Sequence, residues 1–269
     1  MSLLPPPPGQ QKPLTFTLPT GPSQVSTVAP KVLLYAVPGW GKTTLAFYAP
    51  NPYMLSHVRE TGYDHLTASG QEKPIMQTTI DSWKTLVQAV TAVASAKHID
   101  SLWLDCLGMF QQLCEEHVRN TEFNGSPSEY QSYSKGDART LQVWNELLIA
   151  LDNVTRAGKM VVMLSHCSVK NHKNPMGSDY DRYIPSANEK VAAATAAWAS
   201  DVLFGSYETA VSKDGKAMGG KSRIVKASEE AGFVAKSQRG VPPFILVGDD
   251  KRAGYEKVFG SLFNKKGKQ

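Results

Sequence analysis

Residues 36–44 read Ala36-Val37-Pro38-Gly39-Trp40-Gly41-Lys42-Thr43-Thr44. A short apolar run precedes them at Val32–Tyr35, and a helical stretch begins at Lys42. This context fits the pattern G-x-x-x-x-G-K-[ST], in which backbone N–H groups and a helix N-terminus surround phosphate oxygens. Alanine replaces the first glycine, which the loop tolerates if that residue keeps a negative φ. The motif predicts a nucleoside triphosphate site, and a chance Gly-Lys-Thr turn is the alternative.

The residue types in this loop have separate expected roles. We expect Lys42 to reach the β- and γ-phosphates of ATP, and Thr43 to place its hydroxyl on Mg²⁺. The two glycines let the backbone approach the phosphates closely. The expected nucleotide contacts are Pro38, Gly39, Trp40, Gly41, Lys42, Thr43 and Thr44.

Two carboxylates are candidates for holding the metal and for activating water. Asp105 ends the apolar run Leu102–Leu104, where it can serve the same Mg²⁺ as Thr43; the alternative is a cap for a following helix. Glu60 follows the apolar run Tyr53–Leu55, where it can orient the water that attacks the γ-phosphate. An exposed loop glutamate explains Glu60 equally well, and the sequence leaves that choice open.

His166 follows the clearest buried strand, Met160–Leu164. Ligands of open α/β sheets bind at the carboxyl ends of the strands. We therefore expect His166 to contact a γ-phosphate and to report its presence to the loop that follows. A satisfied structural histidine is the alternative.

Cations and aromatic rings mix in the polar segment after His166. Cations can track phosphates while rings stack on bases, so this composition suits single-stranded DNA. An ordinary solvated loop is the alternative. The candidate DNA-binding residues are Lys170, His172, Lys173, Tyr180, Arg182 and Tyr183.

Two further cations, Lys236 and Arg239, follow the strand-like run Phe233–Ala235. In a ring or filament such cations can reach the γ-phosphate of a neighbouring subunit, as an arginine finger does. A surface turn is the alternative, and the sequence does not decide between the two.

Apolar runs alternate with amphipathic helical stretches along most of the chain. The strongest helical pattern is Leu141–Arg156, with Gly158 as its stop, and we expect Asp81 to cap an earlier helix. Two polar segments, 119–137 and 168–190, are expected to be loops. The alternation predicts an α/β fold with a mainly parallel central sheet and helices on both faces.

Composition narrows the class of protein. The chain has 269 residues, of which 41% are hydrophobic and 20% charged, so it can bury a core and is not disordered throughout. No run approaches the roughly 20 apolar residues of a membrane span, and the N-terminus does not read as a secretion signal. The three cysteines form no CxxC pair, which favours a reducing compartment. We expect a cytoplasmic protein without a membrane partner.

The two ends of the chain differ from its middle. Residues 1–30 hold eight of the 17 prolines and no acidic residue, which predicts an extended arm. Apolar and polar residues alternate at Leu14–Leu18, which indicates an edge strand added either to this domain or to a neighbouring subunit. Residues 251–269 carry six basic residues and one acidic residue, which account for the whole net charge of +5. We expect a proline-rich arm at 1–30, an ATPase core at 31–250 and a basic tail at 251–269, which is either solubilising or in contact with phosphate backbones.

The order of the motifs resembles phage-encoded nucleotide-binding proteins of the RecA-like P-loop ATPase class. More narrowly, the chain is similar to the core-only RecA-like ATPases of single-strand annealing. The resemblance covers about residues 31–245. It is carried by AVPGWGKTT at 36–44, ETG at 60–62, LWLDC at 102–106, LSH at 164–166, DYDRYIP at 179–185, W-x-x-D at 198–201 and the cations near Arg239.

The resemblance implies a RecA-like core with a set of catalytic roles. ATP·Mg²⁺ would be bound by Lys42 and Thr43, with Asp105 serving the metal. The water-orienting base would be Glu60, the phosphate sensor His166 and the inter-subunit cations Lys236 and Arg239. The two polar segments would match DNA-binding loops. The chain departs from the family pattern at residue 36 and in its Lys-x-x-Arg spacing, where ring helicases have Lys-x-Arg, so which cation acts across an interface stays open.

We therefore expect a DNA-dependent ATPase that binds single-stranded DNA and promotes annealing or strand exchange in phage homologous recombination, in the cytoplasm of a bacterial host. It would form a homo-oligomer, a ring or a filament, with ATP between subunits, and a single-strand DNA-binding protein is a candidate partner. The alternatives are a RecA-like motor or helicase-loading ATPase in DNA replication, a P-loop small-molecule kinase, and a nucleotide-binding scaffold without hydrolysis.

Overall fold

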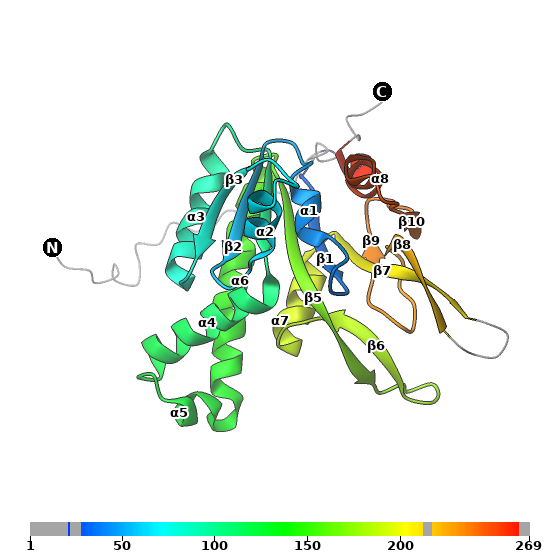
Figure 1. The fold of residues 1–269 in the computed structure, drawn as a ribbon. Helices are drawn as coiled ribbons and strands as arrows, with labels where there is room; N and C mark the ends of the chain where they lie inside the picture. The colour runs from blue at the N-terminus through cyan, green and yellow to red at the C-terminus, as the bar shows by residue number, and fades with distance from the viewer. Residues whose placement is uncertain (1–20, 22–27, 212–216, 264–269) are drawn as a thin grey trace.

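The computed structural model describes residue 21 and residues 28–211 and 217–263 (Figure 1). The strands are β1 Lys31–Ala36, β2 Pro52–His57, β3 Met76–Ile80, β4 Ser101–Asp105, β5 Met160–His172, β6 Tyr180–Pro185, β7 Asp201–Val211, β8 Ala217–Lys226, β9 Lys236–Ser237 and β10 Phe244–Leu246. The helices are α1 Lys42–Ala46, α2 Gly62–Ala68, α3 Trp83–Ser95, α4 Leu107–Glu122, α5 Pro127–Gln131, the 3₁₀ helix η1 Ser132–Ser134, α6 Lys135–Arg156, α7 Glu189–Trp198 and α8 Lys251–Phe263.

The described strands form a ten-stranded sheet in the order β10-β8-β7-β1-β5-β4-β2-β3, with β6 paired to β5 and β9 to β7. From β7 to β3 along this order, neighbouring strands are parallel. The strands β6, β8, β9 and β10 pair antiparallel with their neighbours. The predicted mainly parallel sheet is therefore confirmed.

Helices cover both faces of this sheet, as predicted (Figure 1). Leu33 and Tyr35 of β1 belong to a core with buried residues of α3, α4 and α6. Their neighbours Val32 and Leu34 point the other way, into a second core with α1 and α8. The central strands are buried on both sides, which explains why they read as continuous apolar runs rather than alternating ones.

The strand register places the carboxyl ends of β1, β2 and β4 beside His166 of β5, at one edge of the sheet. Ala36, the last residue of β1, pairs with His166 of β5, and Leu164 of β5 pairs with Asp105, the last residue of β4. Asp105 also pairs with Ser56 near the end of β2. Because parallel strands end at the same edge, loops that are distant in the sequence meet there.

Three local expectations were wrong. The cap of α3 is Ser82, whose Oγ accepts a hydrogen bond from the Thr85 N–H at 3.3 Å, and not Asp81. Segment 119–137 is mostly helical and contains the end of α4, then α5, η1 and the start of α6. Segment 168–190 is mainly a β-hairpin, in which β5 continues to His172 and pairs with β6. This hairpin extends beyond the rest of the sheet (Figure 1).

The expected basic tail is also corrected. Residues 251–263 form α8, whose Tyr255, Val258, Phe259 and Leu262 are buried in the second core. The Phe259 ring packs edge-on against Trp103 of β4, with 5.3 Å between ring centroids. The packed core therefore continues past the predicted boundary at residue 250, and residues 264–269 lie outside the described part of the chain.

Most of the predicted arm, including the edge strand at Leu14–Leu18, lies outside the described residues. Its last residues join the core: the Pro30 carbonyl accepts a hydrogen bond from the Val161 N–H at 2.9 Å. Across the described ranges, no helix has both the length and the apolar character needed to cross a bilayer.

Candidate functional site

The loop between β1 and α1 turns at two glycines in the left-handed region. Gly39 has φ +73° and Gly41 has φ +96°. A side chain is strained at both positions, and a β-carbon on Gly41 would also lie 3.1 Å from Nη1 of Arg223. Ala36 is a strand residue outside the positive-φ set, so alanine is compatible with the first position of the motif.

Strand β7 holds this loop in place. The Val37 N–H donates to the Gly205 carbonyl at 3.1 Å, and the Tyr207 hydroxyl donates to the Gly39 carbonyl at 2.8 Å. The Trp40 indole is fully buried and donates to the Ser206 carbonyl at 3.0 Å. The Trp40 side chain is therefore an anchor for the loop, which leaves only its backbone for the expected nucleotide contact.

Lys42 is held inside the loop. Its side chain is almost completely buried, and Nζ donates to the Ala36 carbonyl at 3.3 Å. Burial lowers the pKa of Lys42, while the nearby charge of Asp105 acts in the opposite direction. A bound phosphate would compensate this buried cation, as the motif predicts.

Thr43 and Asp105 meet as the sequence predicts. The Thr43 hydroxyl donates to Oδ2 of Asp105 at 2.8 Å. Burial raises the pKa of Asp105 to about 6, with a further contribution from the charge of Glu60. The cap of α4 is Cys106, without a side-chain cap bond, so Asp105 does not cap that helix. A hydroxyl and a buried carboxylate form a hard oxygen pair that fits Mg²⁺.

Glu60 is not an exposed loop residue. Its side chain is 16% exposed, and Oε1 lies 3.1 Å from Nε2 of His166. The same oxygen accepts a hydrogen bond from the Cys106 thiol at 2.9 Å. The hydrogen bond with His166 lowers the pKa of Glu60, against the effect of burial, so Glu60 is a carboxylate at neutral pH.

The Glu60 segment lies against the predicted metal pair. A β-carbon on Gly62 would be 3.2 Å from the Thr43 hydroxyl oxygen. The structure thus brings together five of the predicted catalytic and metal-binding residues from four parts of the chain. They are Lys42, Thr43, Glu60, Asp105 and His166.

Lys236 and Arg239 do not join this group. Lys236 pairs with Val202 of β7, and Val202 pairs with Leu33, three residues before the end of β1. At roughly 3.3 Å per residue, Lys236 therefore lies about 10 Å back from the loop along the sheet. Lys236 donates to the Ala197 carbonyl at 3.2 Å, and Arg239 contacts the Val28 carbonyl.

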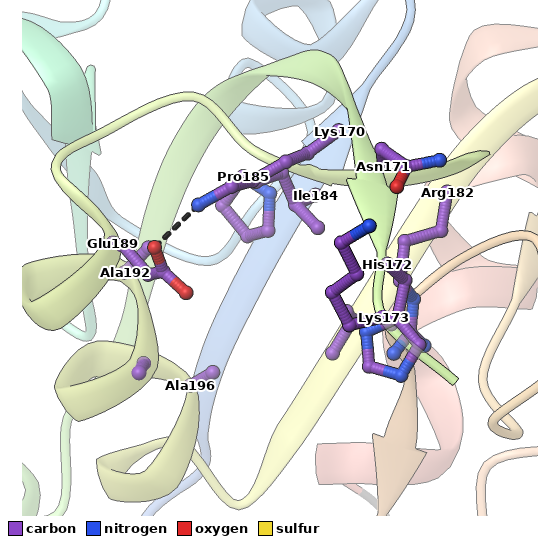
Figure 2. Close-up of a pocket in the computed structure, with 12 residues that line it drawn as sticks. Lys170, Asn171, His172, Lys173, Arg182, Ile184, Pro185, Glu189, Ala192 and Ala196 are labelled. Atoms are coloured by element: carbon purple, nitrogen blue, oxygen red, sulfur yellow. Dashed lines mark hydrogen bonds and ion pairs between the residues drawn. The ribbon is translucent and has the colours of Figure 1, made fainter. Parts of the chain in front are cut away.

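The six candidate DNA-binding residues lie on or beside the β5–β6 hairpin. A groove of about 510 Å³ separates the hairpin from α7. Figure 2 shows Lys170, His172 and Lys173 around this groove, with Lys170 paired to Glu189. Lys173 pairs with Asp179. These lysines are exposed, and the alanines of α7 line the groove.

Two of the six have contacts inside the protein. The Arg182 side chain is only 13% exposed, pairs with Glu229 and donates to the Phe233 carbonyl at 2.9 Å. The Tyr183 ring stacks on Phe204 with 5.1 Å between centroids and remains 38% exposed. Arg182 therefore has a packing role in this structure, whereas Tyr183 still offers part of its ring.

Sequence reasoning missed Arg223 of β8. Its Nε and Nη2 donate to the Gly248 carbonyl at 3.1 and 2.6 Å, and Nη1 faces Gly41 of the loop. Its cross-strand neighbour is Tyr207, which holds Gly39. No sequence motif marks Arg223 as a site residue. Only the pairing of β7 with β8 shows that it lies beside the phosphate loop.

Comparison with known proteins agrees with the geometry of the loop. Residues 29–239 match a family model described as an AAA domain, a match that takes in all the predicted site residues and Arg223. No curated protein matches the chain. The family is one of P-loop ATPases, which bind and hydrolyse nucleotides, usually with Mg²⁺. Because the match covers well over half of its length, this chain belongs to the AAA domain family.

Proposed function

We propose that this protein is a DNA-dependent ATPase that couples ATP hydrolysis at the β1–α1 loop to binding of single-stranded DNA at the β5–β6 hairpin. One observation carries the proposal: β5 is a single strand that contains both His166, beside Glu60, and the hairpin residues up to His172. A change at the phosphate end therefore has a direct covalent path to the groove.

In the proposed reaction, Lys42 and the loop amides bind the triphosphate, and Thr43 and Asp105 hold Mg²⁺. The metal supplies neutralisation of phosphate charge when it is bound. Glu60 orients a water molecule and accepts its proton as the water oxygen bonds to the γ-phosphorus. The bond between the γ-phosphorus and the bridging oxygen breaks, so that ADP and phosphate are formed. His166 contacts the γ-phosphate and loses that contact after hydrolysis.

We also assign a nucleotide contact to Arg223. Glu60 follows β2 and Asp105 ends β4, on one side of β1 in the sheet, while Arg223 lies on β8, on the other side. A triphosphate whose γ end faces Glu60 then directs its nucleoside end towards β8. Two nitrogens of Arg223 are fixed on Gly248, which orients the third towards the loop. Arg223 would thus bind the part of the nucleotide that ATP and ADP share.

The groove beside the hairpin suits a nucleic acid backbone. Lys170 and Lys173 are paired with carboxylates at the surface, where such pairs are weak. Phosphates can replace these carboxylates as partners, while the exposed part of the Tyr183 ring and the half-buried Tyr180 ring offer stacking surfaces. Annealing or strand exchange in phage homologous recombination is the process we propose for this activity.

The proposal includes a homo-oligomer with ATP between subunits. Lys236 and Arg239 lie away from the loop of their own chain, so any contribution to hydrolysis would be made to a neighbouring subunit. Electron microscopy with single-stranded DNA and a slowly hydrolysed ATP analogue tests whether a ring or filament forms.

The coupling is tested by measuring single-stranded DNA affinity with an ATP analogue, with ADP and without nucleotide. We expect tighter binding with the analogue than with ADP. Equal affinity in all three states would remove the coupling. The variant Lys84→Ala/Lys97→Ala changes two exposed lysines away from the hairpin, on or just after α3, and should leave the affinity for single-stranded DNA unchanged in each state. Strand unwinding or translocation would instead favour the motor alternative, and ATP turnover without any response to DNA would favour the kinase.

A further inference from the structure

Three side chains with metal-binding atoms, a thiol, an imidazole and a carboxylate, converge beside the phosphate loop. Glu60 follows β2, Cys106 follows β4, and His166 lies in β5. One ligand atom from each lies within 4.8 Å of the others. The Cys106 sulfur is 2.9 Å from Glu60 Oε1, and His166 Nε2 is 3.1 Å from the same oxygen. Within the described ranges, no other group of His, Cys, Asp and Glu meets this criterion.

We propose that Glu60, Cys106 and His166 form a binding site for a thiophilic divalent cation of the Zn²⁺ class. Thiolate, imidazole and carboxylate are the ligands that Zn²⁺ takes in proteins, at about 2.3 Å for sulfur and about 2.0 Å for nitrogen or oxygen. Tetrahedral coordination with such bonds separates the ligand atoms by roughly 3.3–3.5 Å. The sulfur–oxygen distance of 2.9 Å and the nitrogen–oxygen distance of 3.1 Å are somewhat shorter than these, and the sulfur–nitrogen distance is within 4.8 Å, so side-chain rotations would open the group around an ion.

The arrangement also provides an entry path and an open position. Cys106 is buried, Glu60 is mostly buried, and the His166 side chain is 46% exposed, so an ion approaches past the imidazole. Three protein ligands leave a fourth position for water. Binding replaces the thiol proton of Cys106, which leaves to solvent as the sulfur–metal bond forms.

This site differs in kind from the Thr43–Asp105 pair next to it. A hydroxyl and a carboxylate are hard oxygen ligands that suit Mg²⁺, whereas a thiolate and an imidazole favour softer cations. The two adjacent sites therefore select different metals. One consequence rests on the proposed function: an ion at the soft site occupies Glu60 and His166, so it stops hydrolysis while Lys42 and the loop still bind nucleotide.

The site is tested with Co²⁺ as an optical probe for Zn²⁺, on the full chain without nucleotide or DNA. We expect a near-ultraviolet sulfur-to-cobalt charge-transfer band, visible bands of tetrahedral Co²⁺, and loss of both on addition of Zn²⁺. Cys106→Ser should abolish the charge-transfer band. His166→Gln, at a half-exposed position that folding should tolerate, should weaken Co²⁺ binding by about tenfold or more.

The neighbouring thiol provides a matched control. Cys167 is partly exposed and adjacent to His166 in β5, but successive strand residues point to opposite faces. Cys167→Ser should therefore leave the cobalt spectrum unchanged. The proposal is overturned if the unaltered protein gives no charge-transfer band, or if the band survives Cys106→Ser and disappears with Cys167→Ser. Circular dichroism of each variant checks that it is folded.

The inhibition is tested separately, at buffered free Zn²⁺. We expect ATP turnover to fall while binding of a fluorescent ATP analogue persists. Loss of both together would mean that zinc acts on the phosphate loop instead. If the protein has no ATP turnover at all, the proposed function fails, but the cobalt spectrum still decides whether the metal site exists.

Discussion

The phosphate site and the β5–β6 hairpin share strand β5, which carries His166 at one and His172 at the other, yet their charged residues are in opposite situations. Lys42 and Asp105 are buried, and each is bonded within the site. Lys170 and Lys173 are exposed, and each is paired with a surface carboxylate. The buried groups have a fixed geometry, and the loss of a partner raises their free energy strongly. The exposed groups can exchange partners with little change in free energy. The first arrangement suits catalysis, and the second suits binding of a charged polymer whatever its sequence.

The strongest test of this contrast removes the buried cation. Lys42→Ala should abolish binding of ATP with Mg²⁺, because it removes the buried cation that the loop holds for the β- and γ-phosphates. Calorimetry measures the loss, and Lys84→Ala is the matched control. Undiminished heat of binding in the folded variant would contradict the loop assignment.

Glu60→Gln should separate chemistry from binding. An amide cannot accept the proton of the attacking water, and a general base contributes typically 10²–10⁴-fold to a rate. We expect turnover to fall by about that factor, with little change in affinity for an ATP analogue. Phosphate release and analogue titration measure the two quantities, and a fully active variant would exclude Glu60 as the base.

Arg223→Ala should have an intermediate effect. A charge-assisted hydrogen bond contributes about 1.5–3 kcal/mol, so we expect affinity for both ATP and ADP to fall by about tenfold to a hundredfold. Because the contact is with the shared part of the nucleotide, the ratio of the two affinities should stay constant. A loss confined to ATP would move Arg223 to the γ-phosphate instead.

The smallest effect is expected at the hairpin. Lys170→Ala/Lys173→Ala should weaken DNA binding moderately and reduce the slope of log affinity against log salt by roughly 1.4, since each phosphate contact on a single strand contributes about 0.7. Fluorescence anisotropy at several salt concentrations measures it. An unchanged slope would show that DNA binds elsewhere. Arg182→Ala is a useful contrast, because the loss of an internally bonded side chain should lower the free energy of unfolding more than it changes the salt slope.

Much of the phosphate site was predictable because its signals are local. The strand, the glycine turn and Lys42 are contiguous, and Asp105 follows directly on a buried strand. The two carboxylates also illustrate the limit: Asp105 could be assigned from its strand, whereas Glu60 stayed undecided until its contact with His166, 106 residues away, was seen.

The errors fall where long-range packing overrides local composition. Segment 168–190 is polar enough for a loop, but pairing between β5 and β6 satisfies its backbone and makes it a hairpin. Residues 251–263 look like a basic tail, but their apolar side chains lie on one side of α8 and are buried. Net charge concealed this amphipathic pattern, because the cations of α8 are satisfied around the buried face: Lys251 pairs with Glu72, and Lys257 donates to the Leu246 and Val247 carbonyls.

By itself, the sequence determined the fold class, the phosphate loop and the pairing of Thr43 with Asp105, because these depend on backbone conformation and strand burial, which neighbouring residues set. Only the tertiary structure decided that Cys106 lies against Glu60 and His166, that Arg223 faces Gly41 and that Arg182 is bonded internally. These contacts join segments far apart in the chain, and their formation depends on which strands are neighbours in the sheet and not on any local pattern.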